Sequence, residues 1–319
     1  MPAATASTIS YDHGIVAVDA DYVRPKFDAT HLIVEQGRAA YVDTGTHHSV
    51  PHLLDALARY DIDAANVDYL FVTHVHLDHA GGAGELLRHL PNAKAVLHPR
   101  GAPHIIDPAK LVRGTIDVYG EQQFLDMYEQ VVPAAADRVV VTADGESFRL
   151  AGRELVCFFT EGHARHHYCV WDAQSNSVFA GDSFGVSYRE LDTAAGEFIF
   201  PSTTPIDFDP AAAHISIDRI MSYEPQQIFI THYSRIFDLQ RLADNLHDGI
   251  DFLADLARRH AASSDRTTEI AAGMFANFFQ RLQTHGFSGE EETARQILQF
   301  DIRINTMGLD VWLRRMSNH

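Results

Sequence analysis

Residues 73–82, with the sequence THVHLDHAGG, concentrate side chains that bind metal ions. Four potential ligands fall within six positions, namely His74, His76, Asp78 and His79. Imidazole suits zinc, iron, nickel and copper, whereas carboxylate oxygen favours harder ions, so three histidines and one aspartate describe a borderline site. The composition of this segment therefore favours zinc or iron and disfavours calcium.

The elements around this segment place the four ligands on a turn. An apolar, β-prone run at 69–72 precedes the segment, and Gly81, Gly82 and a helical pattern follow it. The ligands therefore lie between a strand and a helix. Because such a turn can direct several side chains toward one point, we interpret the segment as the first half of a two-metal site.

Three more potential ligands follow short apolar segments further along the chain. They are His163 in the sequence TEGH, Asp182 after SVFAG and His232 after IFIT. A chain with 20 histidines will place two or three together by chance, on the surface or as hydrogen-bonded core residues. Chance does not readily explain three ligands at strand ends, which would converge on one edge of a sheet core. The pattern therefore favours a metal site.

The order His-x-His-x-Asp-His, followed by His, Asp and His, resembles the ligand pattern of the metallo-β-lactamase superfamily, over about residues 10–235. The resemblance implies that the first metal is bound by His74, His76 and His163. It implies that the second metal is bound by Asp78, His79 and His232, and that Asp182 bridges the two. The implied cofactors are two divalent metal ions, with zinc favoured and iron or manganese as alternatives.

Residues 162–167, GHARHH, are similar to the Gly-His-Thr-x-x-His signature of glyoxalase II, with Ala164 where Thr is common. Asp43 follows a strand pattern, where it either forms a turn or orients a metal-bound histidine, and we favour the second role. His167 and Tyr233 either donate a proton or a hydrogen bond during catalysis or are structural hydrogen-bonding residues. His104 is a candidate pocket residue.

The apolar patterns predict an α+β fold with two sheets. Strands of the first sheet are expected at 14–18, 31–34, 39–42, 69–72 and 93–98, with helices at 50–58 and 83–89. A second sheet is expected from strands at 138–142, 154–160, 168–171 and 177–180, and a helix at 210–223 leads to a last strand at 227–231. The resemblance supplies the layer order, which is a four-layer αββα sandwich.

The remaining segments are expected to be loops or helices. Residues 98–104 resemble a loop, and 111–130 form an insertion without a strand pattern that could cover the cleft, with Tyr119, Phe124 and Tyr128 as pocket candidates or ordinary packing residues. From 236 onward the pattern is helical, with amphipathic helices at 239–256 and 270–282 and two short helices at 294–298 and 309–313. We therefore predict a domain at 1–235 and a C-terminal helical extension at 236–319, which either lines the pocket or forms a homodimer.

The composition excludes several classes of partner. The net charge of −18 argues against binding a nucleic-acid backbone. Only Cys157 and Cys169 are present, which is too few for a disulfide framework and fits reduced core residues. Residues 1–10 lack the pattern of a signal peptide, and no apolar run is long enough to cross a membrane. We therefore expect a cytoplasmic protein with a small-molecule substrate and no membrane or nucleic-acid partner.

These features together favour a binuclear metal-dependent hydrolase. A hydroxide bridging two cations is available near neutral pH, and it would attack the carbonyl of a thioester, ester or lactone while Asp78 orients it. The alternative is a non-haem iron dioxygenase similar to persulfide dioxygenases, or a di-iron oxygen-binding protein. Against the di-iron alternative, flavodiiron relatives typically have Glu where this chain has His76.

Overall fold

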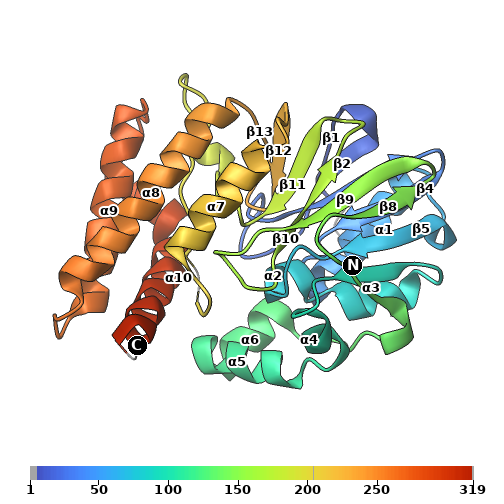
Figure 1. Ribbon diagram of the computed structural model, residues 1–319, viewed down its shortest axis with the longest axis horizontal. Helices are drawn as coiled ribbons and strands as arrows, with labels where there is room; N and C mark the ends of the chain where they lie inside the picture. The colour runs from blue at the N-terminus through green and yellow to red at the C-terminus, as the bar shows by residue number, and fades with distance from the viewer. Residues whose placement is uncertain (1–5, 204, 318–319) are drawn as a thin grey trace. The chain divides into compact units, whose positions relative to one another are not determined.

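The computed structural model describes residues 6–203 and 205–317, which form two compact units. The first unit extends to Phe159 and also contains His166–Gly181 and Gln227–Arg235. The second contains Thr160–Arg165, Asp182–Gln226 and the chain from Ile236 onward. Figure 1 traces the elements in chain order. The domain boundary expected after residue 235 stays a prediction, and of the N-terminal segment 1–10 only residues from Ala6 onward are described.

The first sheet is built in chain order, from antiparallel strands followed by parallel ones. Its strands are β1 (Thr8–Ser10), β2 (Ile15–Asp19), β3 (Ala29–Glu35), β4 (Arg38–Val42), β5 (Val67–Phe71), β6 (Lys94–Leu97) and β7 (Val139–Val141). Pairing is antiparallel from β1 to β4 and parallel from β4 to β7. Parallel pairing brings the carboxyl ends of β4 and β5 to the same edge of the sheet.

The assignment of residues 138–142 to the second sheet was wrong. β7 pairs in parallel with β6, with Val140 opposite Val96, so it completes the first sheet. Parallel neighbours need a long crossover, and the helical segment between β6 and β7 supplies it. A short apolar run does not reveal which of two sheets it joins, so the sequence pattern alone could not decide this.

The second sheet has the order β13-β12-β11-β10-β9-β8. Its strands are β8 (Glu146–Leu150), β9 (Arg153–Phe159), β10 (Tyr168–Asp172), β11 (Ser177–Gly181), β12 (Gln227–Ile230) and β13 (Ser234–Ile236). β8 to β11 pair antiparallel, while β11 and β12 are parallel, so both of the latter end at one edge. β1, β8 and β13 were not predicted, because two of them have only three residues and β8 alternates charged and apolar side chains.

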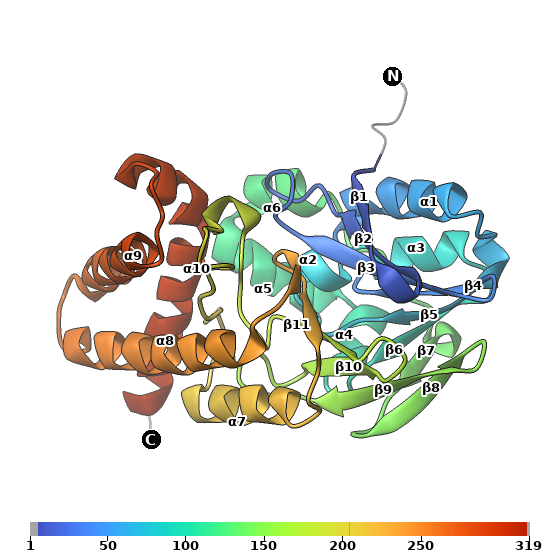
Figure 2. The same cartoon turned by 90° about the horizontal axis from the view of Figure 1, so that it is seen from above.

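Apolar side chains fill the space between the two sheets and the space behind the first sheet. Val42 and Phe71 of the first sheet share a buried cluster with Leu155 and Phe179 of the second. Helices α1 (Val50–Arg59), α3 (Ala83–His89) and α4 (Ala102–Ile106) contribute to a second cluster with the other face of the first sheet. Figure 2 shows α1 and α3 on one side of β4 and β5, with β8 to β10 on the other. Each buried Leu or Phe contributes about 1.5–3 kcal/mol to stability.

Three further predictions concern the two cysteines, the loop at 98–104 and the insertion that follows it. Cys157 and Cys169 are both buried, as expected of core residues. The loop expected at 98–104 was wrong in its second half, because α4 begins at Ala102. The insertion continues as α5 (Ala109–Tyr119) and α6 (Glu121–Tyr128), which meet at Gly120, whose φ of 84° favours glycine.

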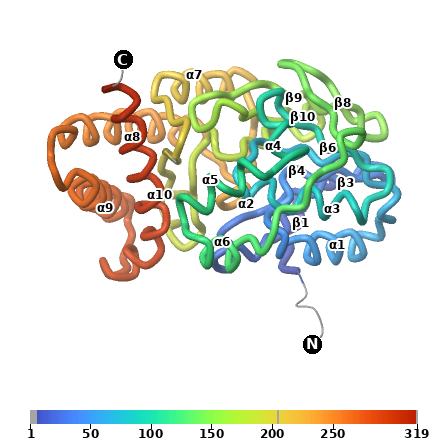
Figure 3. Tube along the Cα trace, turned by 90° about the horizontal axis from the view of Figure 1, so that it is seen from below, coloured from blue at the N-terminus to red at the C-terminus, as the bar shows by residue number. Residues whose placement is uncertain are grey.

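The second unit contains four long helices. They are α7 (Pro210–Met221), α8 (Leu239–His260), α9 (Arg266–Thr284) and α10 (Glu291–Ser317), which Figure 3 shows as successive coils. Within residues 6–203 and 205–317, none of the helices combines the length and the apolar run that a bilayer crossing requires.

The two short helices expected at 294–298 and 309–313 are one continuous helix, α10. Polar residues between the two apolar stretches gave the impression of a break, but their side chains face partners inside the unit. The hydroxyl of Tyr188 donates to Asp301 at 3.0 Å, and the backbone N–H of Thr203 donates to Asn305 Oδ1 at 2.7 Å. Buried polar groups with partners are compatible with an unbroken helix.

The buried histidine of β3, His31, predicts an acid-dependent loss of stability. His31 packs edge-on against the stacked rings of Phe179 and Phe229, and burial lowers its pKa from 6.5 to about 4. The unfolded chain takes up a proton near pH 6.5 while the folded chain does not. The contribution of His31 to the free energy of unfolding should therefore fall by about 3 kcal/mol as the pH falls from 6.5 to 4.

Urea unfolding at pH 7.5 and at pH 4.5 measures this effect. The His31→Gln variant should lose less stability between these two pH values than the wild type. His48→Gln, which removes an exposed histidine, should behave like the wild type. An equal loss in the wild type and in His31→Gln would show that His31 does not titrate as described.

Candidate metal centre

The loop after β5 positions four of the expected ligands. β5 ends at Phe71, and α2 (Leu77–Ala80) begins directly after His76. Two glycines allow the loop to pack closely on its neighbours: a Cβ on Gly81 would lie 2.4 Å from the carbonyl oxygen of Leu77, and one on Gly82 would lie 2.6 Å from that of Thr44. The Gly-Gly pair after the ligands is therefore a steric requirement of this turn.

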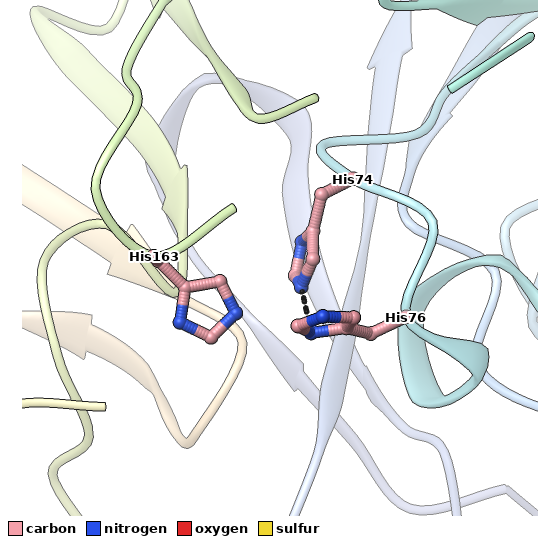
Figure 4. A group of neighbouring side chains, drawn as sticks. All are labelled: His74, His76 and His163. Atoms are coloured by element: carbon pink, nitrogen blue, oxygen red, sulfur yellow. Dashed lines mark hydrogen bonds between the residues drawn. The ribbon is translucent and has the colours of Figure 1, made fainter. Parts of the chain in front are cut away.

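The imidazole rings of this loop lie against one another. His74 Nε2 and His76 Nδ1 are 2.8 Å apart, as Figure 4 shows. The ring of His74 also lies 4.0 Å from the ring of His79 and 4.8 Å from that of His167, between centroids. His163, drawn in the same figure, belongs to the second unit. The loop therefore concentrates imidazole nitrogens with little solvent access, since His74 and His79 are almost fully buried.

Three donor atoms from two distant parts of the first unit converge. Asp78 Oδ2 lies 3.7 Å from His79 Nε2 and 3.7 Å from His232 Nε2. His232 follows β12, and Asp78 lies on α2. Ligand atoms of these three residues all lie within 4.8 Å of one another. Two imidazole nitrogens and one carboxylate oxygen around a single point are a donor set suited to zinc or iron.

A carboxylate lies behind each of these two histidines. His79 Nδ1 is 2.7 Å from Asp43 Oδ2, and His232 Nδ1 is 2.7 Å from Asp28 Oδ1. Histidines that bind metals usually donate their other ring N–H to a carboxylate or carbonyl group, which fixes the tautomer and the ring orientation. Both Nε2 atoms are therefore left facing the point where the donors converge. This arrangement fits a bound cation.

Asp43 connects the ends of three strands. Its Oδ1 accepts hydrogen bonds from the N–H and the hydroxyl of Thr73, both at 2.8 Å. Its Oδ2 accepts from the hydroxyl of Thr231 at 3.0 Å, beside the contact with His79. Asp43 follows β4, Thr73 follows β5 and Thr231 follows β12. One buried carboxylate thus joins the two ligand-bearing strand ends of the first unit.

Asp28 and Thr231 were missed by the sequence analysis. Asp28 directly precedes β3, and no ligand motif surrounds it. Burial raises the pKa of Asp28 to about 7, and the neighbouring His232 partly offsets this effect. The only available signal was an acidic residue beside a strand, which is common in turns. The contact of Asp28 with His232 depends on how the strands pack, so it could not be predicted from the neighbouring residues in the sequence.

His163 and Asp182, the remaining two expected ligands, lie together in the second unit. His163 Nε2 is 3.5 Å from Asp182 Oδ2, and both residues are about 95% buried. A cavity of about 20 Å³ adjoins them, which is large enough for a single water molecule. Residues of α7 and α8, including Ile217 and Leu246, line the same cavity.

Each of these two ligands follows a glycine whose position admits no side chain. Gly162 has a φ of 121°, and a Cβ there would lie 2.4 Å from the backbone nitrogen of Ala213 on α7. Gly181 has a φ of 48°, and a Cβ there would lie 2.6 Å from His167 Nε2. The two glycines therefore allow tight turns at the ends of β9 and β11.

The other expected pocket residues have different surroundings. His167 is fully buried against His74, whereas Tyr233 packs in a small cluster with Ala17 and Ala29, which favours a structural role for Tyr233. His104 is half-buried on α4, and its side chain makes no hydrogen bond or ion pair to any residue that the structure describes. Their roles in the site stay predictions.

A pair of tyrosines lies near Asp78. The hydroxyls of Tyr22 and Tyr128 are 2.8 Å apart, and both side chains are buried. Burial raises the pKa of both phenols well above its usual value, and the negative charge of Asp78 adds to this effect. Both hydroxyls therefore remain protonated donors at neutral pH. Tyr128 was a pocket candidate from the sequence, whereas Tyr22 was missed.

The chain is similar to several known proteins. The family model described as the metallo-beta-lactamase superfamily matches residues 25–233. Metallo-beta-lactamase fold-containing protein ST1585 of Sulfurisphaera tokodaii is 25% identical over 233 residues, which are 69% of this chain and 77% of that protein. Hydroxyacylglutathione hydrolase of Salmonella paratyphi A is 26% identical over 166 residues, which are 50% of this chain and 49% of that protein. This chain thus spans about half of that hydrolase.

A solved structure has the same fold. The crystal structure of metallo-beta-lactamase family protein TTHA1429 from Thermus thermophilus matches with a TM-score of 0.68 and 19% sequence identity. The match covers 95% of this chain and 94% of that one. The expected α+β architecture, with two sheets, covering helices and a C-terminal helical region, is confirmed. At this identity the likeness concerns the fold alone.

The carboxylate of Asp43 should set the affinity for metal. In Asp43→Asn the negative charge behind His79 is lost and an amide faces the ring. We expect metal affinity to fall by about 10–100-fold. Competition against a chelator of known affinity measures this change.

Asp63→Asn provides a matched control, because Asp63 is an exposed aspartate that accepts a backbone hydrogen bond from Ala65 at 2.8 Å. It should bind metal like the wild type. Equal affinity in all three proteins would mean that Asp43 only supports the turn.

Proposed function

Because the chain belongs to the metallo-beta-lactamase superfamily, we propose that it is a metal-dependent hydrolase that cleaves a thioester, ester or lactone of a small organic acid. The observation that carries this proposal is the pair of histidines, His79 and His232, each backed by a carboxylate at 2.7 Å and each facing Asp78. This arrangement suits a bound cation and would be costly without one, since it gathers polar groups in a buried place.

We further propose that the chain binds two cations through the seven ligands predicted from the sequence. His163 lies in the short loop between β9 and β10, and Asp182 directly follows Gly181, the last residue of β11. Both are therefore strand-end residues, as the sequence pattern predicts. His163 would join His74 and His76 at one cation, and Asp182 would bridge to the cation of Asp78, His79 and His232.

A pair of divalent cations, when bound, lowers the pKa of water so that a hydroxide nucleophile is available near neutral pH. The chain's own residues would position that nucleophile. Asp78 has a partly exposed side chain, and one of its oxygens faces the two histidines. Its other oxygen is available to accept a hydrogen bond from the attacking water and to hold its proton.

The tyrosine pair supports a carbonyl substrate. Tyr22 and Tyr128 keep their protons at neutral pH, because burial and the charge of Asp78 raise the pKa of both phenols. One hydroxyl of the pair donates to the other, which leaves one hydroxyl hydrogen for a carbonyl or carboxylate group bound near Asp78. A thiolate can leave without being protonated. Cleavage of a thioester therefore needs no general acid in the site. The relative named hydroxyacylglutathione hydrolase supports the same substrate class.

The metal content and the reaction should be measured together. Protein purified without added metal is examined by elemental analysis and assayed with thioesters, esters and lactones, in air and without oxygen. We expect two equivalents of divalent metal, with zinc favoured, and hydrolysis that does not depend on oxygen. One equivalent of iron with oxygen uptake on a persulfide substrate would instead support the dioxygenase alternative and contradict the proposal.

Replacement of Asp78 tests its role. Asp78→Asn should lower kcat by about 10²–10⁴-fold, because the amide neither accepts the proton nor binds the cation as well. Asp126→Asn, which changes an exposed aspartate hydrogen-bonded to Gln122, should leave kcat unchanged. If Asp78→Asn keeps both its metal content and the kcat of the wild type, Asp78 has no role in the mechanism.

A further inference from the structure

A second group of histidines and carboxylates lies between α7 and α8, within the second unit. His214 and Asp218 are one turn apart on α7, and His247 and Asp251 are one turn apart on α8. Each histidine reaches across to the aspartate of the other helix: His214 Nε2 lies 3.1 Å from Asp251 Oδ1, and His247 Nε2 lies 3.2 Å from Asp218 Oδ1. The four side chains therefore form a symmetrical bridge between the helices.

The two imidazoles face each other through the same ring atom. The Nδ1 atoms of His214 and His247 are 2.6 Å apart, the ring planes differ by 6°, and the ring centroids are 4.9 Å apart. The Nδ1–Nδ1 distance is shorter than the distance between the centroids by about twice the radius of an imidazole ring. The two Nδ1 atoms therefore lie close to the line that joins the centroids. Because the rings are nearly parallel, each Nδ1 points at the other, and at 2.6 Å the space between them holds only a shared proton.

A single shared proton can satisfy this group. If both rings donate their Nε2–H to the aspartates and are neutral, both Nδ1 lone pairs face each other and repel. One additional proton between the two Nδ1 atoms relieves this repulsion, and the two aspartates offset its charge, so a metal ion must displace this proton to bind. The aspartates are each about 75% exposed, and exposed ion pairs contribute little to stability. Stability of the fold therefore gives little reason for the alignment of these four side chains.

The same arrangement recurs at the candidate metal centre. There, His74 and His76 bring ring nitrogens to 2.8 Å, and the histidines His79 and His232 each have a carboxylate at the nitrogen that faces away from the convergence point. At the bridge between the helices, facing nitrogens and outer carboxylates occur on the same two histidines. Carboxylates at the outer nitrogens hold the tautomer in which the inner nitrogens are free to bind a metal.

We propose that His214 and His247 bind a divalent transition-metal ion through their Nδ1 atoms, with water completing the coordination. Zinc bound by two imidazoles at about 2.0–2.1 Å in tetrahedral geometry separates the nitrogens by about 3.3 Å, so the rings must move apart by about 0.7 Å and turn until both lone pairs point at the ion. Both histidine side chains are about 28% exposed, which permits this movement and the entry of water. Among divalent ions, Cu²⁺ should bind most tightly and Zn²⁺ and Ni²⁺ less tightly.

This ion would fix α7 against α8, and α7 in turn holds the loop that carries His163. The hydroxyl of Ser216 on α7 donates to the carbonyl oxygen of Glu161, and the N–H of Asp209, which caps α7, donates to the carbonyl oxygen of Gly162 at 2.8 Å. The proposed ion would therefore stabilise the position of α7, the helix that supports the loop of His163. Its ligands are separate from those of the candidate metal centre.

The number of bound ions in matched variants tests the proposal. The full chain is freed of metal with a chelator, loaded with Cu²⁺ or Zn²⁺ by equilibrium dialysis and examined by elemental analysis. His214→Gln and His247→Gln should each bind one equivalent fewer than the wild type, and Zn²⁺ should raise the Tm of both less than that of the wild type. The electron paramagnetic resonance spectrum of the Cu²⁺-loaded wild type should contain a component from two imidazole nitrogens that both variants lack.

His89→Gln is the matched control, because it removes an exposed histidine 3.2 Å from Glu85 that has no second histidine beside it. It should bind as many ions as the wild type. The double variant Asp218→Asn, Asp251→Asn keeps both ligands and should bind the additional ion about tenfold more weakly. Equal stoichiometry, affinity and copper spectra in the wild type and both histidine variants would overturn the proposal, whether or not the hydrolase assay detects activity.

Discussion

The buried carboxylate of Asp43 is the interaction on which the candidate metal centre depends. It accepts two hydrogen bonds from Thr73, one from Thr231, and it lies 2.7 Å from His79 Nδ1. A buried charge is costly unless several groups compensate it, so this contact strongly constrains the local geometry. The consequence is that the loop after β5 and the residue before His232 are held in one arrangement, and the Nε2 atoms of the two histidines face Asp78.

The sequence was sufficient for the parts of this arrangement that are local. Ligands that follow apolar runs were expected at strand ends, and the structure places His74, Asp182 and His232 after β5, β11 and β12. Parallel pairing of β11 with β12 brings the ends of these two strands to one edge of the second sheet. Asp43, which was expected to orient a metal-bound histidine, lies 2.7 Å from His79 Nδ1, and its role in binding metal stays a prediction.

Features that depend on non-local packing could not be predicted. β7 joined the first sheet because β6 had an open edge, and no residue of β7 carries that information. α10 stayed continuous because Asp301 and Asn305 found partners on another segment of the second unit. Asp28 lies behind His232 only because β3 begins beside the end of β12, as the hydrogen bond from the N–H of Ala29 to the carbonyl oxygen of Thr231 indicates.

The central proposal is that the seven ligands predicted from the sequence surround a pair of neighbouring cations. Anomalous diffraction from crystals of the metal-loaded protein would measure this directly. Around these seven side chains the account predicts two peaks about 3.5–4 Å apart, one of them within coordination distance of His79 Nε2 and His232 Nε2 and both of them in contact with Asp182. A single peak, or two peaks with the side chains of His163 and Asp182 turned away from them, would contradict it.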